Sequence, residues 1–153
     1  MPNILAFIEI FVRRIAIPVL LEAMLTLVTY VGALFEIVVG AAFVFSPEAL
    51  HNGYKPAPGM ESYAFELFGI ACVFWGLLTA CKATDKAILA FNVLWNAIWA
   101  AYLYLIFSGI AWRPQVAIED GSFAFVPLIA HGVFAVNSLL AFLMAPSNKV
   151  KTS

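Results

Sequence analysis

The sequence predicts an all-α membrane protein: an antiparallel four-transmembrane-helix bundle with an N-terminal amphipathic or kinked helix. The chain of 153 residues is 64% hydrophobic and only 11% charged, with a mean hydropathy of +0.98. A soluble domain, by contrast, is about 45–50% apolar and about 25% charged. Four apolar stretches are each long enough to cross a bilayer, for which about 20 helical residues suffice. The segments between them are short and polar, so we expect the helices to lie antiparallel.

The four predicted spans lie within residues 19–145, and residues 146–153 form a tail. The spans are placed at residues 19–45, 62–82, 86–108 and 123–144. The first is longer than the bilayer requires and is expected to tilt.

The connections between the spans carry helix-start signals. Ser-Pro-Glu at 46–48 has the N-cap, first-position proline and first-turn acid that predict a short surface helix. Segment 82–86 is so short that the second and third spans must form a hairpin, with Thr84 as the expected N-cap of the third. Ser62 is the expected N-cap of the second span.

Residues 1–18 differ from the spans. Apolar side chains recur there at helical spacing, while Glu9, Arg13 and Arg14 gather toward the other side. The stretch is too short to cross a bilayer. Two placements stay open: an interfacial helix with its arginines at the headgroups, or an extension of a long first helix that is kinked at Pro18.

The distribution of Lys and Arg predicts that both termini face the cytosol. With this orientation only Lys55 and Arg113, of the eight basic residues, lie on the other side, as the positive-inside rule requires. Lys149 and Lys151 then lie in the cytosol, third and fifth from the carboxyl end. This pattern resembles the dilysine-type retrieval signal of endoplasmic reticulum membrane proteins. The alternative is that two lysines simply keep the last helix from being drawn into the membrane.

Four polar side chains, one from each span, are predicted to share one half of the bundle and to form a candidate binding pocket: Glu36, Glu66, Asn96 and His131. At the helix rise, Glu36 lies about 13 Å, His131 about 12 Å and Asn96 about 18 Å below the non-cytosolic surface, and Glu66 is shallower. A charge at the bilayer centre costs about 2.5–3.5 kcal/mol, so we expect Glu36 to face the bundle interior. The same helical faces carry small and polar residues, among them Thr29, Ala33, Gly40, Gly69, Gly76, Asn92 and Ser138.

Three interpretations of this polar layer remain open. In the first, Glu36 is protonated or paired with His131 and only ties helices together, by hydrogen bonds of about 0.6–2 kcal/mol each. In the second, the layer is a ligand pocket or a proton-handling site, because ionisable groups inside membranes often mark substrate paths. In the third, this face docks a partner helix.

Several functions are excluded by what the chain lacks. The net charge of −1 and the absence of a basic patch argue against nucleic acid as a partner. No cofactor or metal is expected, because only one histidine falls within a span and there is no Glu-x-x-His motif. Cys72 and Cys81 lie nine positions apart on one predicted helix, so both are expected to be free thiols. No Gly-rich phosphate loop or complete catalytic set is present.

A family resemblance rests on two strings, GALFEIVVGAAFVFSP at 32–47 and FELFGIACVFWGLL at 65–78. Together with the charged hairpin and the lone histidine of the fourth span, they resemble the DoxX-like group of small four-helix membrane proteins. Members of that group include accessory subunits of redox enzymes and endoplasmic reticulum chaperones for multi-span receptors, and the group has no shared catalytic motif. The chain is also similar in architecture to a small four-helix scaffold that tethers enzymes of sterol synthesis.

The expected function is therefore that of an accessory, assembly or scaffold subunit in a larger membrane complex. Its expected partners are membrane lipids and other transmembrane subunits. The alternative is a lipid- or sterol-binding membrane protein, or an isomerase that uses Glu36 and His131 as acid and base. The sequence thus leaves open whether the protein is an enzyme.

Overall fold

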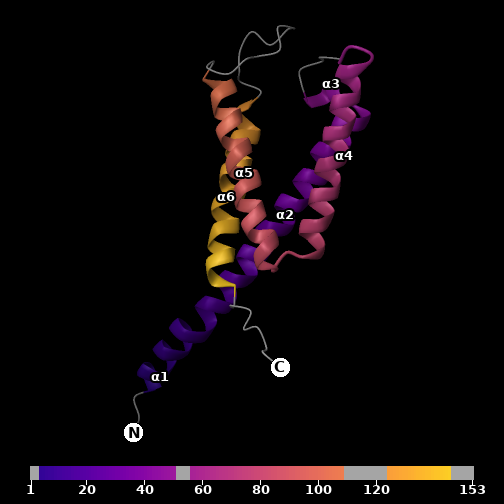
Figure 1. Ribbon diagram of the computed structural model, residues 1–153. Coiled ribbons are helices and arrows are strands. Elements are labelled where there is room, and N and C mark those ends of the chain that lie inside the picture. Colours follow the sequence, from indigo (N-terminus) through magenta and orange to yellow (C-terminus); the bar gives the residue numbers. More distant parts are fainter. Residues whose placement is uncertain (1–3, 51–55, 109–123, 146–153) are drawn as a thin grey trace.

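The computed structural model describes residues 4–50, 56–108 and 124–145, and these ranges contain helices and turns but no strand. Four of the helices are long and apolar enough to span a membrane (Figure 1). They are α2 (Ile17–Phe45), α4 (Met60–Cys81), α5 (Lys86–Phe107) and α6 (Phe125–Met144). Every predicted span boundary agrees with these helices to within two residues. The predicted fold class is confirmed, and the chain is a multi-pass integral membrane protein.

The N-terminal residues continue directly into the first span. Helix α1 (Ile4–Phe11) leads into a π-helical turn, η1 (Val12–Ala16), and then into α2 with no break (Figure 1). At the end of η1 the N–H of Ile17 donates to the carbonyl of Val12, five residues back. This wider turn comes just before Pro18, whose ring and missing N–H disturb ordinary helical bonding. Residues 4–45 therefore form one long helix, whereas an interfacial position of residues 1–18 stays a prediction.

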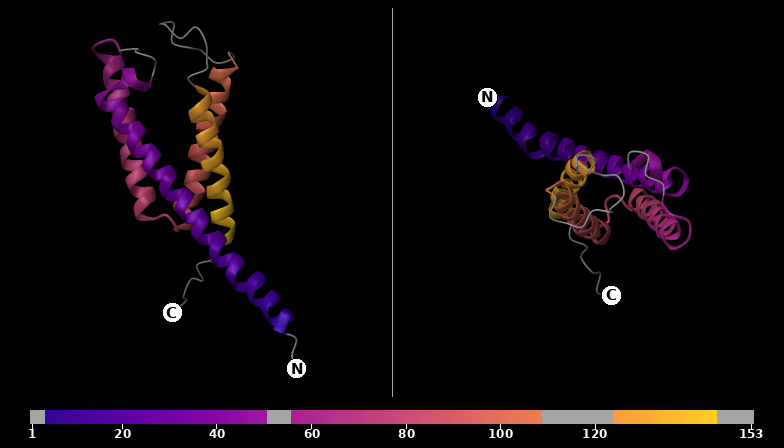
Figure 2. Two further views of the ribbon diagram at one scale, coloured as in Figure 1. Left: turned by 180° about the vertical axis from the view of Figure 1, so that it is seen from behind. Right: turned by 90° about the horizontal axis from the view of Figure 1, so that it is seen from above.

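The four spans are arranged as two pairs. Helix α2 packs along α4, and α5 packs along α6. The pairs meet where α2 crosses α6, near the end that carries the α4/α5 hairpin at residues 82–85, and they splay apart toward the other end (Figures 1 and 2). We call these the hairpin end and the α3 end, because the short helix α3 (Pro47–Leu50) lies at the second. The space between the pairs widens toward the α3 end.

Glycines bring α2 and α4 into backbone contact. A Cβ atom added to Gly40 would lie 2.5 Å from the carbonyl oxygen of Gly69, and one added to Gly69 would lie 2.5 Å from that of Gly40. One added to Gly76 would lie 2.6 Å from the carbonyl oxygen of Ala33. Small residues allow this close approach in lipid, where van der Waals packing drives helix association. The α2/α4 pair therefore depends on having no side chain at these positions.

Two predicted helix caps were wrong. Asp85, rather than Thr84, caps α5, and its carboxylate accepts hydrogen bonds from the N–H groups of Ala87 at 2.8 Å and Ile88 at 3.3 Å. Aspartate is favoured over threonine at the N-cap position of helices, and here its side chain is the one that reaches both N–H groups. Ser62 lies inside the first turn of α4, because that helix already starts after Gly59, whose φ of 103° suits glycine. The predicted surface helix after Ser46 is present as α3.

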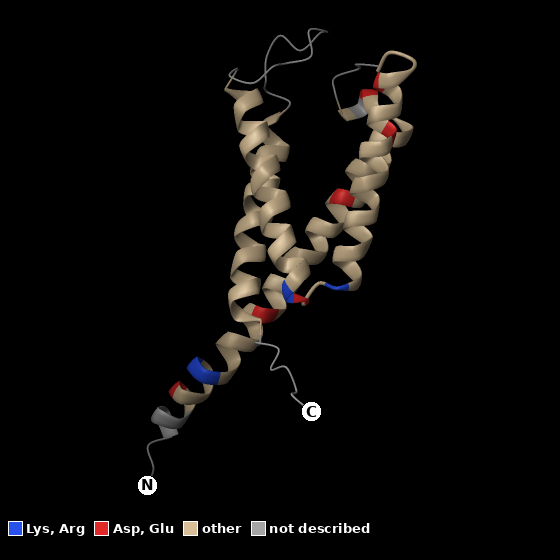
Figure 3. Ribbon diagram, in the orientation of Figure 1, with Lys and Arg blue, Asp and Glu red and all other residues tan. Residues whose placement is uncertain are grey.

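Basic residues gather at one end of the bundle. Within the described part of the chain, Lys and Arg occur only along the N-terminal extension and at the hairpin end (Figure 3): Arg13, Arg14, Lys82 and Lys86. This agrees with the charge asymmetry in the sequence, whereas the assignment of the hairpin end to the cytosol stays a prediction. Lys55, Arg113, Lys149 and Lys151 lie outside the described residues.

Candidate functional site

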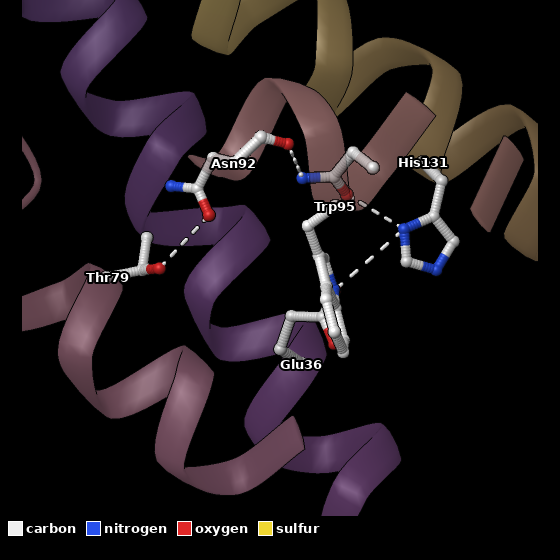
Figure 4. Close-up of polar contacts among 6 residues, drawn as sticks. Glu36, Thr79, Asn92, Trp95 and His131 are labelled. Atoms are coloured by element: carbon white, nitrogen blue, oxygen red, sulfur yellow. Dashed lines mark hydrogen bonds and ion pairs between the residues drawn. The ribbon is translucent and has the colours of Figure 1, made fainter. Parts of the chain in front are cut away.

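Glu36 lies on α2 where the two helix pairs converge, and it is buried, with 6% of its surface exposed. The indole N–H of Trp95 on α5 donates to its Oε1 at 2.8 Å. Nδ1 of His131 on α6 lies 3.8 Å from the same oxygen (Figure 4). The thiol of Cys72 on α4 also interacts with this carboxylate. Side chains from all four spans therefore surround the carboxylate of Glu36. This burial is expected, because a carboxylate exposed to lipid acyl chains would cost free energy.

The ring of His131 is held in one orientation. Its Nδ1 lies 2.8 Å from Oδ1 of Asn96, whose amide nitrogen donates to the carbonyl of Asn92 at 2.9 Å. That second bond assigns the oxygen of Asn96 to the histidine side, so Nδ1 carries the proton that is donated. The ring stacks on Trp99, with centroids 6.3 Å apart, and meets Phe35 edge-on at 5.5 Å. Nε2 is the ring nitrogen that points away from Glu36 (Figure 4), so it can accept a hydrogen bond from another partner.

Further polar contacts continue from this site toward the hairpin end. The hydroxyl of Thr79 on α4 donates to Oδ1 of Asn92 on α5 at 3.2 Å. On α6, the amide nitrogen of Asn137 donates to the carbonyl of Leu25 at 3.0 Å and to Oγ1 of Thr29 at 3.1 Å. These are the bonds that join α6 to α2 where the two helices cross, so we expect them to stabilise the junction between the pairs.

Replacing Asn137 by alanine is therefore expected to lower the free energy of unfolding by about 1–2 kcal/mol, because α2 and α6 lose two buried hydrogen bonds. The measurement is thermal unfolding of the purified protein in detergent. The matched control is Val136→Ala at the next position, where the side chain is 60% exposed on the outer face of α6. Equal effects of the two substitutions would contradict this role for Asn137.

An apolar cavity of about 300 Å³ lies between the helix pairs, on the α3 side of Glu36. All four spans and α3 contribute to its wall. On each span, one lining residue lies closest to the hairpin end: Phe35 on α2, Cys72 on α4, Trp99 on α5 and His131 on α6. Glu36 follows Phe35 directly. The polar groups of the lining therefore lie at the narrow end of the cavity. The rest of the lining is apolar: Val39, Phe43, Leu50, Phe68, Leu103, Val126 and Pro127. The volume is at the lower limit of about 300–1,000 Å³ that is usual for ligand pockets.

The structure brings together three of the four predicted pocket residues. Glu36, Asn96 and His131 are buried and linked to one another. Glu66 does not join them: it is exposed, and its Oε1 accepts a 3.2 Å hydrogen bond from the hydroxyl of Ser62. The reason is its place near the start of α4, where the pairs have already separated and a carboxylate can reach the headgroup region.

Sequence reasoning missed three participants. Trp95 lies inside the predicted third span but is not among the predicted pocket residues, yet its indole N–H donates to Glu36. Thr79 and Asn137 were not singled out, although both are polar residues inside predicted spans and both are buried. Asn137 precedes Ser138, which shares the face of His131, and a helix face wide enough to meet two neighbours includes both positions. Their positions next to a helical face of small and polar residues were therefore the signal that could have identified them.

The described residues contain no group of three or more His, Cys, Asp or Glu side chains that could hold a metal ion. Cys72 and Cys81 are both free thiols, as predicted. Comparison of the chain with protein-family models, with curated proteins and with solved structures finds no significant match. The resemblance to DoxX-like proteins therefore stays a prediction from the sequence.

Proposed function

We propose that this protein binds an amphipathic membrane ligand, a lipid or sterol-like molecule, in the cavity between its helix pairs. The observation that carries the proposal is the combination of an apolar cavity with a buried Glu36 and His131 at one end of it. Packing alone would have filled this space, because protein interiors leave few voids larger than a water molecule.

The lining matches a ligand with an apolar body and one polar group. Phe35, Phe43, Phe68 and Trp99 supply aromatic surface for rings or acyl chains. At the narrow end, Glu36 and Nε2 of His131 offer hydrogen bonds to a hydroxyl or similar group. Such bonds give orientation and specificity in a pocket that is otherwise apolar.

Binding is better supported than catalysis. An isomerase that moves a double bond or a proton along its substrate needs acid and base at two separate positions of that substrate. Glu36 and His131 lie 3.8 Å apart at the same end of the cavity. They can therefore both contact one polar group, which suits a binding site.

The proposal is tested by purifying the protein in mild detergent and identifying retained lipids by native mass spectrometry. We expect a retained lipid or sterol-like molecule that is lost in Glu36→Gln, because the amide no longer supplies the carboxylate. Glu66→Gln is the matched control, since Glu66 is exposed and lies outside the cavity lining. Wild-type protein that carries no such molecule, or a Glu36→Gln variant that carries as much as wild type, would contradict the proposal.

The accessory, assembly or scaffold role stays a second prediction, with other transmembrane subunits as partners. Retrieval to the endoplasmic reticulum through Lys149 and Lys151 belongs to the same prediction. The purification above also tests it, because a protein partner present in stoichiometric amount would support a subunit role. Replacing both lysines by serine in a tagged protein and comparing its location by microscopy tests the retrieval signal.

A further inference from the structure

The narrow end of the large cavity carries two hydrogen-bond acceptors. One is the carboxylate of Glu36, and the other is Nε2 of His131, because the proton of that ring is on Nδ1 and is donated to Asn96. The donors beside the carboxylate are already used: the indole N–H of Trp95 donates to Oε1 of Glu36, and the thiol of Cys72 also interacts with this group. A polar group that enters this end must therefore bring protons to donate.

The carboxylate of Glu36 has no lysine or arginine partner in the described part of the chain. Nδ1 of His131 lies 3.8 Å from it and donates its proton to Asn96 instead. The described Lys and Arg side chains lie along the N-terminal extension and at the hairpin end (Figure 3), and none of them lines the cavity. A buried charge without a partner is costly, so a cation that enters the cavity would be bound strongly.

We propose that the ligand of the large cavity is a protonated amine, an amphipathic molecule whose alkyl or ring-bearing body ends in a primary ammonium group. This assignment rests on the proposed function and narrows it to one chemical class. A primary ammonium carries three N–H donors and a positive charge, whereas a hydroxyl carries one donor and no charge. The ammonium can donate to Glu36 and to His131 together and also supplies the missing counter-charge. A hydroxyl can donate to only one of the two.

Aromatic rings at the same end of the cavity also favour a cation. Phe35 and Trp99 line this end, where both rings contact the ring of His131. The face of an aromatic ring attracts a cation that lies within about 6 Å of its centroid. Beyond them the lining is apolar and includes Phe43 and Phe68, which suits the body of the same molecule. The two ends of the cavity thus match the two parts of an amphipathic amine.

The experiment incubates the purified protein in mild detergent with an equimolar mixture of dodecylamine and dodecan-1-ol at neutral pH. The protein is recovered by gel filtration, and the probes that elute with it are quantified by gas chromatography and mass spectrometry, with protein-free micelles as the blank. The two probes share one alkyl chain and differ only in the polar group, and the amine is protonated at this pH. We expect wild-type protein to bind at least about tenfold more amine than alcohol.

Three variants locate the amine in the cavity. Glu36→Gln keeps the shape of the side chain and removes its charge, so the ratio of amine to alcohol should fall to about one. Glu66→Gln is the matched control and should keep the wild-type ratio, because Glu66 is exposed and lies outside the cavity lining. Val39→Trp fills the cavity, leaves its polar end intact and should bind neither probe. Circular dichroism establishes that each variant is folded.

The comparison within wild-type protein tests the proposal without any variant. Wild-type protein that binds the alcohol as well as the amine, or better, would overturn the amine assignment and leave ligand binding in place. Amine binding that is unchanged in Glu36→Gln or in Val39→Trp would also overturn it, because the amine would then be held outside the cavity. Wild-type protein that binds neither probe above the blank would contradict the proposed function as well.

Discussion

Replacing Gly69 by valine is expected to separate α2 from α4 and to lower the free energy of unfolding by about 3 kcal/mol, the upper end of the usual cost of overpacking. The new Cβ would lie 2.5 Å from the carbonyl oxygen of Gly40 and 2.8 Å from a methyl carbon of Val44. A side chain can change rotamer to relieve a clash, but a carbonyl oxygen moves only with its helix. The whole α2/α4 contact must therefore open.

The measurement is thermal unfolding in detergent, with Gly132→Val as the matched control. Gly132 also lies inside a span, on α6, but a Cβ added there would meet no atom within 4 Å. Both substitutions add the same atoms to a helix, so they differ only in what surrounds the site. Equal losses of stability in the two variants would show that α2 and α4 do not pack against each other through their glycines.

Replacing Val39 by tryptophan is expected to abolish ligand retention while the protein stays folded. Val39 lines the cavity of about 300 Å³, and an indole in place of its isopropyl group would fill much of that space. Glu36 and His131 would keep their partners, because they lie at the narrow end. Loss of the ligand would then follow from lost volume and not from lost polar contacts. The measurement is native mass spectrometry of the purified protein.

Val38→Trp is the control, at the neighbouring position. Val38 is 58% exposed on the outer face of α2, where a larger apolar side chain faces lipid. We expect this variant to retain the ligand as wild type does. If both tryptophans abolish retention, the loss comes from α2 itself; if neither does, the ligand is bound elsewhere.

Hydropathy and helix geometry predicted most of the fold. Each span is an apolar run of nearly fixed minimum length, because the bilayer sets that length. Burial of Glu36 followed from the cost of a charge in hydrocarbon, and its nearness to His131 followed from equal depths computed with the helix rise. These arguments use only the thickness of the bilayer and the cost of a charge in hydrocarbon, which are the same for every span. They need no knowledge of which helices are neighbours.

The pairing of the helices could not be predicted in the same way. Gly40, Gly69 and Gly76 mark faces that allow close approach, but several partners could fit such faces. Whether a cavity remains between the pairs depends on the crossing angle, which side-chain packing sets over the whole interface. This is why Glu66 does not join the predicted pocket. Its side chain lies nearer the α3 end, where the two helix pairs are already apart. Periodicity along one helix does not contain that information.

If a ligand binds between the helix pairs, it must contact the residues that line the cavity above Glu36 and His131. The most direct test is photolabelling of the protein in membranes with a diazirine-bearing sterol or fatty acid, followed by mass spectrometry of the labelled residues. We expect saturable labelling of Val39, Cys72 and Leu103, all of which line the cavity. Labelling confined to outward residues such as Leu34 and Val38, with no saturation, would contradict it.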